Sequence, residues 1–251
     1  MKIKLSLFMF ALIFCSLISY AEEKIPVQEK PQGTLITAEG KVSVYQEEWV
    51  AASEYLPVYP KNIVKTDENS SAEIMLDDET VIRFEEKTKA EILVKDGVPE
   101  ISLKEGEITS SVVPSQQVAF NVSSPLAIIG VRGTEFTVSH RGEKTDVAVY
   151  KGAVEVSDRT KKPKKILVKG GRQTFIFKKS HPAKPIGLSK KYKKYRKKVL
   201  KKFIKRTIKN RQNKEKILAR RMEMIKKRNK RIIENIKKRK ISPPKKRHIQ
   251  H

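Results

Sequence analysis

The chain has 251 residues, enough for one sizeable domain or two small ones, and a formal net charge of +27. Its single cysteine, Cys15, excludes internal disulfides and cysteine-ligated metal sites. The charge is unevenly placed, because residues 188–251 contain 29 Lys and Arg against 3 Asp and Glu, whereas residues 22–177 contain 21 against 25. A mildly acidic middle followed by a polycationic end predicts that the end meets an anionic partner.

The N-terminus has the layout of a secretory signal peptide. A short basic start precedes an apolar run over residues 5–18, and small residues follow at Ser19 and Ala21. We therefore expect residues 1–21 to be a signal peptide and the mature chain to begin at Glu22, exported to the periplasm or cell envelope.

Two alternatives concern the same segment. An uncleaved membrane anchor is disfavoured because the apolar run is shorter than the roughly 20 residues of a comfortable span. Lipid attachment at Cys15 is disfavoured because the bulky Phe14 precedes it, where a small residue is expected.

A β domain is predicted for residues 34–178, after a polar linker at 22–33 that contains two prolines. Apolar residues alternate with polar ones in short runs, which is typical of half-buried strands. The alternating pairs include Val42 and Val44, Ile74 and Leu76, Ile82 and Phe84, Ile101 and Leu103, Phe136 and Val138, and Val147 and Val149. Regular spacing of such runs predicts a mainly β fold, a compact solenoid-like or sandwich-like domain of short strands.

A long basic α-helix is predicted for residues 189–240. A second linker at 179–188 contains two prolines, and no Pro or Gly follows until Pro243. Ser189 is a plausible N-cap, and residues 241–251 are expected to be a disordered basic tail.

The helix carries apolar residues at a 4-3-4-3-4 spacing, which predicts a seam for a coiled coil and a possible homo-oligomer. The predicted seam residues are Leu218, Met222, Ile225, Asn229, Ile232 and Ile236. Two alternatives stay open, since many like charges oppose pairing. In one alternative the helix is a single helix surrounded by solvent, and in the other it lies on an anionic surface.

One sequence block is specific. Residues 120–138 read FNVSSPLAIIGVRGTEFTV, and residues 145–156 read TDVAVYKGAVEV. Together they resemble the signature of the FecR domain family, and the likeness extends over about 34–178. The motif residues, which we treat as a possible partner contact, are Gly130, Val131, Arg132, Gly133, Thr134, Glu135 and Phe136.

The resemblance implies a compact, solenoid-like β domain on the outer side of a membrane. In the founding members of the family this domain receives a signal from an outer-membrane transporter, and a cytoplasmic N-terminal segment controls a sigma factor. Only residues 1–4 precede the apolar run of this chain. We therefore expect the exported domain to carry over and direct sigma-factor regulation not to.

Within the motif, two interpretations compete for Arg132. Arg132 and Glu135 lie three residues apart around Gly133 and could form an ion pair that locks successive turns together. The other interpretation is a loop that contacts a partner or ligand. We expect the first, because paired buried charges more often fix geometry than carry out chemistry.

Catalysis has little support. The four histidines, His140, His181, His248 and His251, do not form a metal-ligand pattern, and no phosphate-binding or nucleophile motif is present. Tyr45 and Trp49 could form a sugar-stacking surface, although a single Trp near a strand is more often in the core. We expect no enzyme, no metal and no cofactor.

The sequence thus favours an exported, non-enzymatic binding or scaffolding protein of the bacterial cell envelope. The β domain would contact an unknown protein or glycan, and the basic helix would contact lipid headgroups, lipopolysaccharide or cell wall. The alternative is a periplasmic signalling component that acts through a separate membrane partner. Nucleic acid is disfavoured by export and by the few aromatics along the tail. Residues 34–178 are expected to fold alone.

Overall fold

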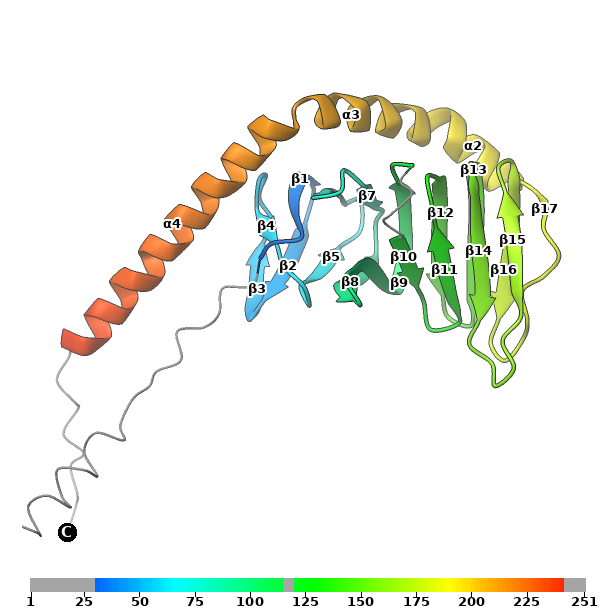
Figure 1. The fold of residues 1–251 in the computed structure, drawn as a ribbon, viewed down its shortest axis with the longest axis horizontal. Coiled ribbons are helices and arrows are strands. Elements are labelled where there is room, and N and C mark those ends of the chain that lie inside the picture. Colours follow the sequence, from blue (N-terminus) through cyan, green and yellow to red (C-terminus); the bar gives the residue numbers. More distant parts are fainter. Residues whose placement is uncertain (1–29, 115–119, 242–251) are drawn as a thin grey trace, which may run out of the picture. The chain divides into compact units, whose positions relative to one another are not determined.

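The computed structural model describes residues 30–114 and 120–241, with side chains as far as Glu234, and these residues form two β-sheets and a series of helices (Figure 1). The signal-peptide prediction, Ile236 of the seam and the last tail residues lie outside the part whose side chains are described. No helix in the described ranges is long and apolar enough to cross a membrane.

Sheet A and sheet B each contain strands from the whole length of the β domain. In spatial order, sheet A consists of β4 (Pro57–Val58), β1 (Gly33–Glu39), β6 (Ser71–Leu76), β7 (Val81–Phe84), the second half of β9 (Val98–Ser111), β12 (Glu135–Arg141), β13 (Lys144–Lys151), β16 (Arg172–Phe177) and β17 (Ile186–Gly187).

Sheet B has the same kind of order. It consists of β3 (Glu48–Ala51), β2 (Val42–Gln46), β5 (Ile63–Thr66), β8 (Thr88–Lys95), the first half of β9, β10 (Phe120–Ser123), β11 (Ala127–Val131), β14 (Ala153–Asp158) and β15 (Lys165–Lys169). These pairs are antiparallel except β9–β10, which is parallel.

The core lies between the two sheets, and it contains the inward residues of the alternating runs. Val44, Ile74, Ile101, Phe136 and Val147 are all completely buried in one apolar cluster. Because successive side chains of a strand point to opposite faces, the residues between them point outward. The mainly β fold expected from the alternation is confirmed.

The chain passes from one sheet to the other within β9, at Gly106. This residue has φ +102°, a conformation that favours glycine, and a Cβ placed there would lie 2.4 Å from the Cα of Thr88. The hydroxyl of Thr88 bonds the backbone of Glu107 at 3.0 and 3.1 Å, so the close approach is held by hydrogen bonds.

Four helical segments follow the sheets: α2 (Lys190–Tyr195), the π-helical η1 (Arg196–Leu200), α3 (Lys201–Gln212) and α4 (Lys214–Ile241). Ser189 precedes α2 as expected, but its side chain makes no capping hydrogen bond. The helix is therefore basic and long as predicted, yet it contains a π-helical turn and is interrupted at Asn213, whose φ and ψ are −97° and 18°.

The π-helical turn has a geometric consequence. Tyr192 and Leu200 are eight residues apart, about 2.2 turns of an α-helix, which would set them roughly a fifth of a turn apart around the helix axis. The wider turn at 196–200 holds more residues per turn and reduces this offset, and both side chains are buried.

A first prediction concerns Gly106. We expect Gly106→Ala to lower the free energy of unfolding by more than about 2 kcal/mol, because it adds a backbone clash to the strain of a positive φ. Gly142→Ala is the matched control, since Gly142 has φ +57° with no atom within 4 Å of the added Cβ. Denaturant unfolding of both variants checks this, and equal losses of stability would contradict the role given to the close approach.

Candidate functional site

The outer face of sheet A carries a polar row directly beneath the helices. Glu73 of β6, Arg83 of β7, Thr109 of β9 and Thr137 of β12 are neighbours in register across four strands. Each alternates along its strand with inward core residues, so the row points away from the core. All four side chains are nevertheless buried, because α3 and its neighbours cover them.

Glu73 is the centre of an ionic cluster between sheet and helix. It is completely buried and pairs with Arg83 at 3.0 Å and with Arg206 of α3. Arg83 also bonds Glu85 at 2.8 Å. Burial alone would lower the pKa of Arg83, but the carboxylates of Glu85 and Glu73 outweigh it and raise that pKa, so Arg83 stays charged.

Two tyrosines extend this cluster across the sheet. The hydroxyl of Tyr195 donates to Glu85 and lies 2.9 Å from the Thr109 hydroxyl. Thr109 bonds Thr137 at 2.7 Å, and Thr137 bonds the Tyr150 hydroxyl at 3.1 Å. The rings of Tyr150 and Tyr195 stack with centroids 6.3 Å apart. A continuous hydrogen-bonded chain therefore joins α2 to three strands.

Apolar anchors accompany the polar contacts. One buried cluster lies between sheet A and the helices, separate from the core between the sheets. Its buried members are Ile36, Met75, Val81, Ala148 and Tyr150 from the strands, and Leu188, Tyr192, Leu200, Phe203 and Ile217 from the chain after them.

The contacts continue on both sides of the break at Asn213. Before it, Arg211 donates to the Ser111 carbonyl at 2.9 Å, and after it, Lys214 pairs with Glu79 at 2.9 Å. Arg221 pairs with Asp77 at 2.6 Å, and Arg228 lies over the ring of Tyr59 at 5.4 Å. We call this whole contact surface, from Tyr192 to Arg228, the clasp. Carboxylates of the β domain thus pair with some of the basic residues for which an anionic partner was expected.

The residues of the predicted seam lie beside the clasp, and the clasp does not bury them. Leu218 and Ile225 are half-buried, whereas Met222 and Ile232 are 50% and 46% exposed. The residues that face the β domain are instead Ile217 and Arg221, one position earlier. Pairing of this seam with a second chain stays a prediction.

The opposite face of α2–α3 is a row of lysines. Residues 190–212 contain no Asp or Glu, and within the described chain none of the following exposed lysines has an ion-pair partner. They are Lys193, Lys194, Lys197, Lys198, Lys201, Lys202, Lys205 and Lys209, which we call the basic ridge.

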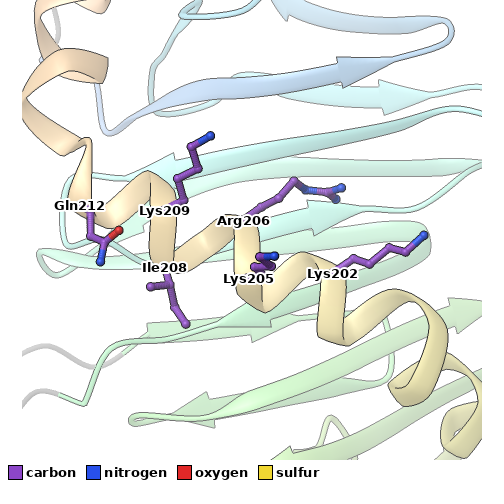
Figure 2. Close-up of a pocket in the computed structure, with 6 residues that line it drawn as sticks. All are labelled: Lys202, Lys205, Arg206, Ile208, Lys209 and Gln212. Atoms are coloured by element: carbon purple, nitrogen blue, oxygen red, sulfur yellow. The ribbon is translucent and has the colours of Figure 1, made fainter.

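Figure 2 shows how part of this ridge is arranged. Lys202, Lys205 and Lys209 fan out from α3 in different directions, beside a shallow hollow of about 470 Å³ that Arg206, Ile208 and Gln212 also line. Their ammonium groups do not converge on one point. The geometry suits contact with an extended anionic surface better than capture of one small anion.

The residues of the FecR-like motif form a corner between the sheets. Val131 and Phe136 lie in the core, and the Thr134 hydroxyl donates to the Ala153 carbonyl at 2.8 Å. Gly133 has φ +64°, and a Cβ there would lie 2.9 Å from the Cα of Pro114.

The expected lock between Arg132 and Glu135 is wrong. Arg132 is exposed, and in the described ranges it forms no ion pair. Gly133 and Thr134 turn the backbone between sheet B and sheet A at this point, so the two side chains do not meet. Contact of the motif with a partner stays a prediction, and Arg132 is its exposed side chain.

The interpretation of Trp49 as a core residue is also wrong. Trp49 is 48% exposed and lies opposite Tyr45 on the outer face of sheet B, with ring centroids 5.5 Å apart. The reason is strand parity, since Val44 and Val50 take the inward positions of this hairpin.

The described residues contain no group of His, Cys, Asp or Glu that could hold a metal ion. His140 is buried in β12 with its Nδ1 2.9 Å from the Thr145 hydroxyl, and burial lowers its pKa. His181 bonds the buried carboxylate of Asp158 at 2.8 Å.

One segment of the chain matches a known protein family. Residues 62–155 match the model of the FecR protein family, which confirms the resemblance over those residues, the Gly130–Phe136 motif included. The matched segment ends before the helices, so the clasp and the basic ridge lie outside it. No match was found among curated proteins.

Two crystal structures from Parabacteroides distasonis, each described as that of a candidate anti-sigma factor, are similar to the chain. The first is 19% identical in sequence, with a TM-score of 0.42. The alignment covers 51% of the present chain and 59% of the crystallised chain. The second is 18% identical with a TM-score of 0.46, and covers 55% and 64%. The chain thus spans less than two thirds of either.

A second prediction tests the clasp. Phe203→Ala removes a completely buried ring from between α3 and sheet A, and we expect it to lower the free energy of unfolding by about 3–5 kcal/mol. Ile208→Ala, on the exposed side of the same helix, should change it by less than about 1 kcal/mol. Denaturant unfolding of both variants checks this. Equal effects would mean that α3 is not docked.

A third prediction concerns alkaline pH. Burial raises the pKa of Tyr192 and Tyr195 above the ordinary value of 10.0, so both phenols stay neutral in the folded chain. Unfolded tyrosines ionise near pH 10, so this contribution to stability is complete below pH 10 and is lost as pH rises above it.

The measurement is urea unfolding at a series of alkaline pH values. Tyr192→Phe should flatten the decline with pH, since it removes one buried phenol. Lysine deprotonation affects both proteins equally and is thereby controlled. An unchanged slope would contradict burial of Tyr192.

Proposed function

We propose that the protein is an exported, non-enzymatic binding or scaffolding component of the bacterial cell envelope, and that its basic ridge holds it on an anionic envelope surface. The observation that carries the proposal is the two-sided helix. One face of α2–α3 packs against sheet A, and the other presents eight lysines that form no ion pair with any residue the structure describes and have no carboxylate among them.

Magnitudes support attachment by charge. A basic residue beside an anionic bilayer contributes about 1 kcal/mol, so engagement of half the ridge provides several kcal/mol. Like charges at helical spacing also repel one another, and an anionic surface relieves that repulsion. The clasp orders the helix beforehand, so binding does not bear the entropic cost of forming it.

A second candidate function is a periplasmic signalling component that acts through a separate membrane partner. The FecR match over residues 62–155 favours it, as does the seam on α4, whose Met222 and Ile232 are accessible. In this reading the ridge holds the protein near the membrane while the seam or Arg132 contacts the partner.

A fourth prediction tests the ridge. The full chain without residues 1–21 is sedimented with vesicles that contain anionic lipid, with neutral vesicles and with purified cell wall. The fourfold variant Lys198→Gln, Lys201→Gln, Lys205→Gln and Lys209→Gln should lose at least about tenfold in affinity for the anionic surface, and binding of the parent should fall as salt is raised.

The matched control removes four exposed, unpaired lysines from the β domain. It is Lys61→Gln, Lys89→Gln, Lys162→Gln and Lys169→Gln, which carries the same change in net charge. If the control loses as much affinity as the ridge variant, net charge rather than the ridge is responsible. If the parent ignores every anionic surface at low salt, the proposed anchoring is wrong.

A further inference from the structure

Three turns meet at the end of the β domain where β16 finishes. They are the turn of residues 124–126 between β10 and β11, the loop of residues 159–164 between β14 and β15, and residues 177–180 after β16. The pairing of Ala127 with Asp158 sets the first beside the second. Between the turns is a hollow of about 440 Å³, lined by Pro125, Leu126, Arg159, Thr160, Lys161, Phe177, Lys178, Lys179 and Ser180.

The walls of the hollow are held in place by buried hydrogen bonds. The buried carboxylate of Asp158 accepts from the amides of Thr160 and Lys164 at 2.9 and 3.0 Å, and bonds His181 at 2.8 Å. Burial would raise the pKa of Asp158, but hydrogen bonds from Thr160, Lys164 and His181 hold it well below its ordinary range. The loop is therefore organised before any ligand arrives.

The rim of the hollow is basic. Arg159, Lys161 and Lys179 form no ion pair within the described residues, whereas Lys178 pairs with Glu143. The two oxygens of the Asp158 carboxylate accept from the amides of Thr160 and Lys164, so they are not available to pair with these three side chains. A positive rim without a carboxylate partner favours an anionic ligand.

Arg159 is suited to a planar anion. Its Nε donates to the Ser124 carbonyl at 2.8 Å, which orients the guanidinium across the first turn. No bond to its two terminal nitrogens is present in the described chain. Two such parallel donors match the two oxygens of a carboxylate.

Part of the lining of the hollow is apolar. Phe177 is 50% exposed, and its ring packs edge-on against Phe175 at 5.6 Å between centroids, with the Lys144 ammonium 5.8 Å from its centre. Pro125 and Leu126 are the other apolar residues of the lining. An apolar wall with a few oriented polar groups is the usual composition of a small-ligand site.

We propose that this hollow binds a carboxylated sugar ring, with the carboxylate on Arg159 and the apolar face of the ring against Phe177. The site is separate from the basic ridge. β16 begins at Arg172, which pairs with Gly187 just before α2, and ends at Phe177 at the far end of the strand. The inference therefore goes beyond the proposed attachment by the ridge and does not depend on it.

The test is site-resolved nuclear magnetic resonance on the isotope-labelled chain without residues 1–21, titrated with glucuronic acid. Salt is kept at about 0.15 M, and the amides of residues 190–212 are followed in the same spectra, so that contact with the ridge is seen separately. We expect saturable shifts of the amides of Leu126, Thr160 and Lys179. Glucose, which lacks the carboxylate, should not produce them.

Variants locate the binding. Arg159→Gln and Phe177→Ala should each weaken glucuronic acid binding by about tenfold or more, in line with the loss of one charged or stacking contact. Lys162→Gln is the matched control, since it removes one charge from the same loop outside the hollow. The fourfold ridge variant should bind glucuronic acid as the parent does.

Three results would overturn the inference. Shifts confined to residues 190–212 would show unspecific contact with lysines, and no saturable shift at all would show no site. Equal or tighter binding of glucose 6-phosphate would mean that the site selects phosphate and that the carboxylate class is wrong. None of these results bears on sedimentation with vesicles, so the two proposals fail independently.

Discussion

A carboxylate buried away from water must be paired with a cation, and Glu73 imposes this constraint on the whole structure. It is completely buried on the outer face of sheet A, between Arg83 of the sheet and Arg206 of α3, 133 residues later. Removal of one partner from such a pair costs about 3–5 kcal/mol, because an uncompensated charge is left behind. The basic helix is thus part of the folded domain. A fragment of residues 34–178 would keep the core between the sheets, but the outer face of sheet A would no longer be covered by the helices.

The clasp also divides the charge of the tail. The cations at Lys191, Arg206, Lys214 and Arg221 are paired with carboxylates of the β domain, and the lysines of the ridge point away from it. A free polycationic helix would present all of its charge in every direction. Docking instead gives the protein one oriented basic face, which makes attachment to a surface compatible with a partner contact elsewhere on the domain.

Sequence reasoning predicted the elements better than their contacts. Alternation identified core residues such as Ile74 and Phe136, since a period of two follows directly from strand geometry. Alternation places Glu73 on the outward side of its strand, and nothing local shows that a helix from the far end of the chain covers that side. Arg132 and Trp49 were misjudged for a related reason. Their surroundings depend on a backbone turn at Gly133 and on the pairing of β2 with β3, which spacing alone does not give.

Hydrogen exchange of backbone amides in the intact chain tests the clasp most directly. Residues 190–212 contain no acidic side chain to offset their charge, so an undocked helix there would be weakly formed. The account predicts that amides of α3 around Phe203 are protected to a degree comparable with those of β9 and β12 beneath them. Exchange of these helix amides at the rate of an unstructured peptide, with the strands still protected, would contradict it.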